Sequence, residues 1–419
     1  MNPIISNANL ANSPVEEGWG NRLKIWLRSL GPGIITAALV FGPSKITITS
    51  KLGAEYGFAL LWIVAVAIFF MVIFTAMAAR IGIATNQSLL SIISQKWGRK
   101  AGIAIGFGVF LVTASFQAGN SIGIGISLSE LTHTSPVRWI VLFNLLGMSL
   151  LFFRAFYKVL EKIMILLVCM ILCAFVTTLV LVKPGFSSVV SGIVPSVPSG
   201  SLTLVIAFIA SCFSIVGAFY QSYLVQERRR INPTVRQSSK DSFTGIFILG
   251  VISTIVLICA ATVLHPAGIK VNSARDMSKA LEPLLGRYAS MLFLCGLFGA
   301  SFSALIGNSS VGGTMLGDAL GYGSQLNSKQ VRFLIALVML MGASVAIAFG
   351  KLPIELIVFA QSVTILITPF IGIAMYAIAN DGRLMGPLKN TTTSKLAGGI
   401  GLLLLIVLGI MSIKDMFFK

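Results

Sequence analysis

Charged residues are scarce in this sequence: Asp, Glu, Lys and Arg make up only 11% of its 419 residues, and only 13 residues are acidic. Soluble domains carry about 25% charged residues, so this composition argues against a soluble globular protein. Hydrophobic residues make up 56% of the chain. We therefore expect the chain to lie in a lipid bilayer, where a large apolar surface is stable.

Histidine and cysteine are also scarce, which excludes most enzyme chemistry. The two histidines, His133 and His265, lie near the ends of apolar segments, and no nucleophile, metal-binding motif or phosphate-binding loop accompanies them. The five cysteines all lie inside apolar segments, where neither a disulfide framework nor a spaced metal-ligand cluster is available. We expect no enzymatic activity, no resident metal and no cofactor.

Basic residues outnumber acidic ones and give a formal net charge of +18. A basic total favours nucleic-acid binding only where the charge forms a patch on one accessible surface. Here most of the basic residues lie in loops between apolar segments. We expect no nucleic-acid partner, and the sequence gives no evidence of a protein partner.

Eleven apolar segments are long enough to cross a bilayer, which takes about 20 residues. They predict an all-α polytopic membrane protein, because a spanning helix satisfies its own backbone hydrogen bonds. The predicted spans are residues 31–55, 58–83, 101–129, 137–154, 160–182, 201–225, 242–264, 288–316, 331–349, 354–379 and 396–413.

Lysine and arginine predict the orientation of the spans, since cytoplasmic loops are enriched in both. They cluster before the first span, after the second, and in the loops at 226–241 and 380–395, whereas the loop at 183–200 holds only Lys183. This alternation predicts a cytoplasmic amino terminus and, with an odd number of spans, a carboxyl terminus outside. We expect an integral protein of the plasma (inner) membrane of a prokaryote.

Two predicted spans contain residues that interrupt a helix near the bilayer midplane. In the first, residues 42–44 (GPS) place a proline where it removes a backbone donor. In the sixth, residues 211–214 (SCFS) and Gly217 form a small and polar interruption. Interrupted helices five spans apart are typical of inverted-repeat transporters, whose substrate lies at the midplane between the repeats. Kinks or close packing contacts at these residues are the alternative.

These features predict two parts of the chain, a cytoplasmic tail at 1–28 and a single transporter domain at 29–419. Two inverted repeats are expected at about 29–183 and 200–380. An additional helix at 396–413 follows them.

Six short strings spread over the chain carry a family resemblance. They are residues 30–33 (LGPG), 56–62 (YGFALLW), 79–85 (ARIGIAT), 224–226 (LVQ), 281–286 (LEPLLG) and 381–386 (DGRLMG). With them the chain resembles the Nramp (natural resistance-associated macrophage protein) family of metal transporters. The resemblance implies a LeuT-type fold with two inverted five-helix repeats plus an eleventh helix, and secondary active transport by alternating access.

The resemblance also implies where the family's metal site would lie, and there this sequence differs. In the family, an Asp-Pro-Gly-Asn motif interrupts the first helix and a Met-Pro-His motif interrupts the sixth. The aspartate, asparagine and methionine bind a divalent transition metal. The aspartate aligns with Gly42 and the asparagine with Lys45, whereas the methionine aligns with Ser214 and a carbonyl donor with Ser211.

The family's proton pathway is altered in the same way. An aspartate and a glutamate of its third helix align with Gln117 and Asn120, and a sixth-helix histidine aligns with Gln221. These former proton-pathway positions carry neutral amides here.

Lys45 is the central candidate for a remodelled substrate site. A nearby ammonium opposes a divalent cation by several kcal/mol at low dielectric, so we predict that transition-metal binding is lost. A lysine near the bilayer centre usually faces a cavity and marks a substrate pathway. The predicted site adds the amino ends of the two second half-helices, which favour anions, and the residues Gly42, Ser44, Thr47, Ser211, Ser214 and Gln361.

Two of these assignments have a structural alternative. Lys45 is alternatively an internal tethered cation, bonded to carbonyls of the interrupted helices and to Ser211 or Ser214. Gln361 is alternatively a packing residue between helices. Lys51 lies about 240° around a helix from Lys45, so we place it outside the site, in an outer vestibule or reaching towards the headgroups.

The residues favour a secondary transporter for a small inorganic anion, with bicarbonate as an example, because Lys45 is gained and the acidic site residues are lost. The alternative is a divalent metal cation transporter with a remodelled site. A third hypothesis is a membrane sensor or scaffold that binds a ligand without transporting it. Sodium or a proton is the expected coupling ion.

Overall fold

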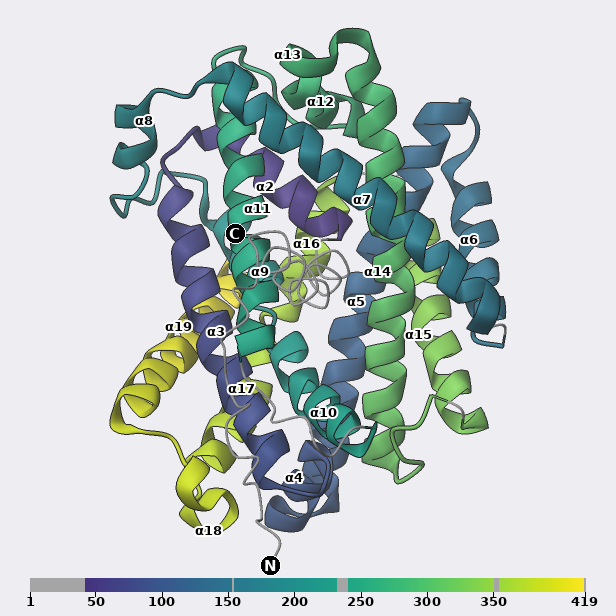
Figure 1. The fold of residues 1–419 in the computed structure, drawn as a ribbon, viewed down its shortest axis with the longest axis vertical. Coiled ribbons are helices and arrows are strands. Elements are labelled where there is room, and N and C mark those ends of the chain that lie inside the picture. The colour runs from purple at the N-terminus through teal and green to yellow at the C-terminus, as the bar shows by residue number, and fades with distance from the viewer. Residues whose placement is uncertain (1–41, 153, 232–239, 327, 350–353, 418–419) are drawn as a thin grey trace, which may run out of the picture.

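The computed structural model describes residues 42–152, 154–231, 240–326, 328–349 and 354–417, and within these ranges every regular element is a helix. Figure 1 shows an elongated bundle in which most helices run along the long axis. Nine of the described helices are long and apolar enough to cross a membrane, and Pro136–Leu150 is a shorter apolar helix. The all-α membrane fold predicted from composition is confirmed.

The described helices follow the predicted spans closely. The first predicted span is described only from residue 42, so the predicted tail at 1–28 and residues 29–41 lie outside the described residues. The helices that correspond to the predicted spans, whole or in two halves, are α2 (Pro43–Tyr56), α3 (Leu61–Ala84), α5 (Arg99–Thr132), α6 (Pro136–Leu150), α7 (Arg154–Val182), α9 (Leu202–Cys212), α10 (Ile215–Ile231), α11 (Lys240–Val263), α14 (Ala289–Leu320), α15 (Lys329–Ala348), α16 (Ile354–Thr364), α17 (Thr368–Ala379) and α19 (Thr392–Phe417).

Short helices lie at the two ends of the bundle. In Figure 1, α8, α12 and α13 lie at the upper end, which is the predicted outside, and α4 and α18 at the lower end, the predicted cytoplasm. Their bounds are α4 (Leu89–Trp97), α8 (Phe186–Ser191), α12 (Ala274–Ser278), η1 (Lys279–Leu281), α13 (Glu282–Leu285), η2 (Gly286–Tyr288), α18 (Gly382–Met385) and η3 (Gly386–Leu388). The orientation and the repeat boundaries stay predictions.

The sixth span is interrupted as predicted. Helix α9 ends at Cys212 and α10 begins at Ile215, with Phe213 and Ser214 between them. Ser214 caps α10, because its hydroxyl oxygen accepts a hydrogen bond of 3.3 Å from the Gly217 backbone N–H. A cap of this kind lowers the energetic cost of a break inside the apolar bundle, since it satisfies one of the free N–H groups of the second half-helix.

The tenth span is also interrupted, which the sequence analysis did not predict. Helix α16 ends at Thr364, and α17 begins at Thr368 with Pro369 in its first turn. Hydroxyl groups satisfy the carbonyls before the break: Ser115 donates to Ala360 O at 2.7 Å, and Thr364 donates to Gln361 O at 2.7 Å. The break is therefore a satisfied structural feature and not a fault in packing.

Candidate functional site

Helix α2 is polar in sequence yet buried along most of its length. Gly42 precedes it in an extended conformation, Pro43 occupies its first turn, and residues 43–54 are all buried. A polar helix inside an apolar bundle is expensive unless its side chains find partners or line a cavity. The contacts of its side chains therefore decide what this helix does.

Lys45 lies in the first turn of α2 with only 3% of its surface exposed. Its Nζ has no hydrogen-bond partner among the described residues, and none of the ion pairs found there includes it. The proposed bonds from Lys45 to Ser211 or Ser214 are thus not present. The amino end of a helix carries a positive partial charge, so α2 adds to the charge of this ammonium and does not offset it.

The α9–α10 interruption lies beside Lys45. Helix α2 contacts α9, whose last residue, Cys212, lies in the neighbourhood of Lys45. The Ser211 hydroxyl donates to Phe208 O at 2.9 Å within its own helix. The Ser214 hydroxyl is already engaged as the cap of α10. Both serines therefore bond to backbone groups at the interruption and not to Lys45.

Ser44 and Gln361 meet directly, from two spans far apart in sequence. Gln361 Nε2 on α16 donates a hydrogen bond of 3.0 Å to Ser44 Oγ, and both side chains are buried. Gln361 Oε1 has no partner among the described residues. Gln361 is therefore packed against α2 and also presents a free acceptor inside the bundle.

Thr47 belongs with Ser44 and not with Lys45. Thr47 follows Lys45 by two positions, so the two side chains point about 200° apart around the helix. Thr47 follows Ser44 by three positions, so these two side chains lie on the same face. Its hydroxyl is buried and has no partner among the described residues. The predicted set therefore divides into two parts, with Lys45 towards α9 and Ser44 with Thr47 towards α16.

The former proton-pathway amides form a bridge between α5 and α14. Asn120 Nδ2 donates to Gln117 Oε1 at 3.1 Å, and Gln117 Nε2 donates to Leu305 O at 2.8 Å. Asn120 Oδ1 lies 3.5 Å from the position that a Cβ at Gly42 would occupy. Gln221 lies on α10 and is half-buried. The two α5 amides thus border the start of α2.

The described residues offer no preformed metal centre. Within the described ranges, no group of three His, Cys, Asp or Glu side chains comes together in a way that could hold a metal ion. Among the predicted site residues, the side-chain groups that could ligate a metal are hydroxyl, amide and amine groups.

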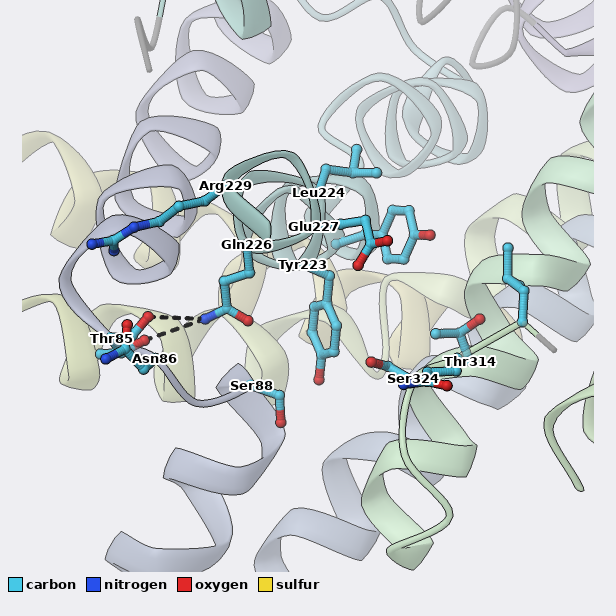
Figure 2. Close-up of a pocket in the computed structure, with 13 residues that line it drawn as sticks. Thr85, Asn86, Ser88, Tyr223, Leu224, Gln226, Glu227, Arg229, Thr314 and Ser324 are labelled. Atoms are coloured by element: carbon cyan, nitrogen blue, oxygen red, sulfur yellow. Dashed lines mark hydrogen bonds between the residues drawn. The ribbon is translucent and has the colours of Figure 1, made fainter. Parts of the chain in front are cut away.

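A separate pocket of about 860 Å³ lies at the predicted cytoplasmic end of the bundle (Figure 2), between α10, the end of α14 and the segment joining α3 to α4. None of the predicted site residues is among its described lining. Tyr223 Oη donates to Asp318 Oδ2 at 2.6 Å beside it, and the Thr314 hydroxyl in its wall is buried without a partner among the described residues. Only the spacing of Tyr220 and Tyr223 on one helix face hints at this pocket in the sequence.

Two contacts of α2 were missed from the sequence. Cys212 was assigned no role, although it ends the helix that packs against α2 in the neighbourhood of Lys45. Lys51 was expected in an outer vestibule or near the headgroups, and its pairing was not foreseen: its Nζ lies 3.2 Å from Glu355 Oε1 on α16. Neither Cys212 nor Glu355 stands out in the sequence, because a cysteine in a span resembles an apolar residue and a carboxylate at the end of a span is expected at the membrane interface.

The helical bundle and its interrupted spans define a secondary transporter of the LeuT type. The family model described as natural resistance-associated macrophage protein-like matches residues 33–415. The chain belongs to the Nramp family.

Curated relatives support this assignment over nearly the whole chain. The divalent metal cation transporter MntH of Deinococcus radiodurans is 26% identical over 395 residues, which cover 90% of this chain and 88% of that protein. The protein of the same name from Granulibacter bethesdensis is 24% identical, covering 92% of this chain and 88% of that protein.

Solved structures support the fold. A mutant of the Eremococcus coleocola manganese transporter has a TM-score of 0.71 at 19% identity, covering 97% of this chain and 89% of that chain. Mhp1, a nucleobase-cation-symport-1 family transporter, has a TM-score of 0.56 at 14% identity, covering 92% of this chain and 93% of that chain. These likenesses confirm the LeuT-type architecture.

Proposed function

We propose that this chain carries a small inorganic ion across the membrane by alternating access, and that the ion binds where α2 begins, beside the α9–α10 interruption. The observation that carries the location is the buried Lys45 ammonium, which lies in the first turn of α2, a helix that contacts α9, and has no partner among the described residues. Membrane proteins rarely bury an unpaired charge at a span centre unless it acts on a substrate or ion.

The relatives favour a divalent metal cation as the cargo. The MntH proteins of Deinococcus radiodurans and Granulibacter bethesdensis are named divalent metal cation transporters, and the Eremococcus coleocola neighbour is a manganese transporter. These comparisons support the metal-cation alternative better than the anion. A metal would have to bind through hydroxyl and amide oxygens on the α16 side, such as Ser44 Oγ and Gln361 Oε1, or through an uncharged Lys45 amine on the α9 side.

A small anion is the second candidate, and Lys45 is the specific observation that favours it. A divalent cation 4 Å from a charged ammonium would be repelled by about 8 kcal/mol at an effective dielectric constant of about 20. An anion in the same place would be attracted, and the amino ends of α2 and α10 would add to the attraction. Bicarbonate is an example of such an anion.

Uptake into proteoliposomes separates the two candidates. Wild-type protein and Lys45→Met are compared for uptake of manganese and of labelled bicarbonate, with Lys329→Met as a control at an exposed lysine. If the wild type takes up manganese, and Lys45→Met changes the rate while Lys329→Met does not, a divalent metal cation is the cargo. Bicarbonate uptake that is lost only in Lys45→Met establishes the anion. Absence of both fluxes from well-folded protein contradicts transport of these ions and favours the sensor or scaffold.

The coupling ion is tested in the same vesicles. We propose a proton or sodium ion, because the family fold works as a secondary transporter and needs a gradient. Uptake is measured with an inward proton gradient, an inward sodium gradient or neither. Stimulation by one gradient identifies the ion, and equal rates in all three contradict coupling to either.

A further inference from the structure

The segment that joins α7 to α9 carries a row of exposed apolar side chains outside the spanning helices. It comprises residues 183–200 and includes the short helix α8, which lies at the upper end of the bundle in Figure 1, the predicted outside. Five of its large apolar side chains are between 44% and 83% exposed; they belong to Phe186, Val190, Ile193, Val194 and Val197. We call these five side chains the 186–197 surface.

The composition of this segment is unsuited to a loop in water. Lys183 is its only charged residue, and the rest are serine, glycine, proline, valine, isoleucine and phenylalanine. Within α8, Phe186 and Val190 are four positions apart and share one side of the helix, whereas the serines at 187, 188 and 191 occupy the other. An exposed apolar patch with a polar opposite side is typical of a surface that meets a partner or a membrane.

The backbone of the segment is held firmly against the start of α3. Trp62 donates twice to it, from its backbone N–H to Gly192 O and from its indole Nε1 to Ser196 O, both at 3.0 Å. The Ser196 hydroxyl donates to Ala59 O at 3.2 Å. A Cβ at Gly192 would lie 2.3 Å from Phe58 O, so only glycine permits this close approach. These contacts satisfy backbone groups that would be costly to leave unpaired at a lipid boundary.

The 186–197 surface continues the lipid-facing side of α7. In the last two turns of that span, Val176, Val180 and Leu181 are 46%, 66% and 52% exposed. Only 28% of the apolar stretch at 165–182 is buried inside the protein, so most of it must face lipid. Phe186 follows Leu181 by five positions and extends the same kind of apolar exposure beyond the end of the span.

We propose that the 186–197 surface lies in the boundary between headgroups and acyl chains of the outer leaflet and anchors the α7–α9 connection to the bilayer. Its partner is a lipid surface, and burial of apolar side chains drives the contact. With Lys183 as its only charge, the segment needs no anionic headgroup. Because it connects the two predicted repeats and holds the start of α3, the anchor sets the outer ends of α3 and α7 relative to the membrane.

Fluorescence quenching tests which medium surrounds the surface. Phe186→Cys, Val194→Cys and Ser187→Cys are each labelled with one small thiol-reactive fluorophore in the full chain and reconstituted in phosphatidylcholine vesicles. The chain without an added cysteine gives the background from its own thiols. Ser187 is the matched control, because it is exposed on the polar side of the same helix and carries the same fluorophore.

Emission is compared with acyl-brominated lipids in the bilayer and with iodide in the water. At positions 186 and 194 we expect brominated lipid to quench about twofold more than iodide, and at position 187 we expect the reverse. The same pattern is expected when anionic phosphatidylglycerol is added to the vesicles.

Three results would overturn the anchor. Equal quenching by iodide at all three positions would place the surface in water. Protection of positions 186 and 194 from both quenchers, relieved when the protein is diluted with lipid, would place a second copy of this chain over it. Lipid quenching that appears only with phosphatidylglycerol would show attraction of charge and not apolar burial. None of these results depends on which ion the protein carries.

Discussion

The Gln361 side-chain amide and the Ser44 hydroxyl, 317 positions apart in sequence, share a buried hydrogen bond of 3.0 Å. The bond joins α16, which ends at the interruption of the tenth span, to the first turn of α2. The bond thereby fixes α16 against α2. A second bond, from the Ser115 hydroxyl on α5 to Ala360 O on α16, fixes α5 against the same helix. The side of the candidate site facing α16 is set by this bond.

Gln361→Leu should weaken the fold and slow transport. The change removes the donor to Ser44 and leaves a buried hydroxyl with one bond fewer, at a cost of about 1–3 kcal/mol. We expect a lower temperature of unfolding in detergent and reduced uptake of whichever ion is carried. Ser362→Ala is the control, because among the described residues that hydroxyl donates to Val358 O within its own helix, at 3.1 Å. An equal loss in both variants would contradict a special role for the Ser44 contact.

Gly53→Ala should be strongly destabilising, because α2 and α11 meet at this glycine. A Cβ there would lie 2.4 Å from Leu257 O and 2.8 Å from Ala260 Cβ, so the helices must move apart. Overpacking of this kind costs about 1–3 kcal/mol. Gly399→Ala is the matched control, since its Cβ would make an ordinary contact of 3.5 Å with Tyr376 Oη. Thermal unfolding of the two variants in detergent checks the difference, and equal stability would contradict the close approach.

Much of the fold could be predicted because a bilayer imposes a simple rule on sequence. A spanning helix needs about 20 apolar residues, so the spans were found to within a few residues. The sixth interruption was also visible, since polar residues at 211–214 stand in an apolar run. The tenth interruption was overlooked: the residues between α16 and α17 are the apolar Ile365, Leu366 and Ile367, although Pro369 just after them is the same kind of signal that marked the first span.

The candidate site was predicted less well, for a reason of helix geometry. The 100° step between residues excluded Lys51 from the face of Lys45, and the same step separates Thr47 from Lys45. The contacts of α2 with α9 and α16 are needed to see that both faces carry polar groups. Cys212 and Glu355 gain their significance only from neighbours that no spacing in the sequence reveals.

Acid should weaken the joint between α4 and the segment before α18. The hydrogen bond from the Lys96 ammonium, with help from the Arg383 and Leu384 backbone N–H groups, lowers the pKa of the Asp381 carboxyl below its usual 3.8. A carboxyl with a lowered pKa in the folded state stabilises the fold above its ordinary pKa, and the contribution is lost as pH falls through the lowered value.

The measurement compares unfolding of wild type and Asp381→Asn in detergent at neutral pH and below pH 3.8. Wild type should be the more stable at neutral pH, and the difference should shrink in acid. Lys96→Met should behave as Asp381→Asn does. A difference that stays constant with pH would show that the carboxylate charge contributes nothing.

Gly42→Asp combined with Lys45→Asn should create or strengthen a metal site at the start of α2. The pair restores the residues that the family resemblance places at these two positions, adding a carboxylate and removing an ammonium. A Cβ at Gly42 would lie 3.2 Å from Ala304 Cβ and 3.5 Å from Asn120 Oδ1, so the new side chain fits after a small shift and lies near an amide oxygen. Manganese binding, measured by calorimetry in detergent, should become about tenfold tighter or more, because repulsion is replaced by attraction. Gly42→Asn with Lys45→Asn is the control that adds the same bulk without charge, and it should gain much less. If both double variants bind manganese with the affinity of the wild type, a metal does not bind at the start of α2. The lack of acidic ligands at that position would then give no reason to prefer an anion over a cation as the cargo.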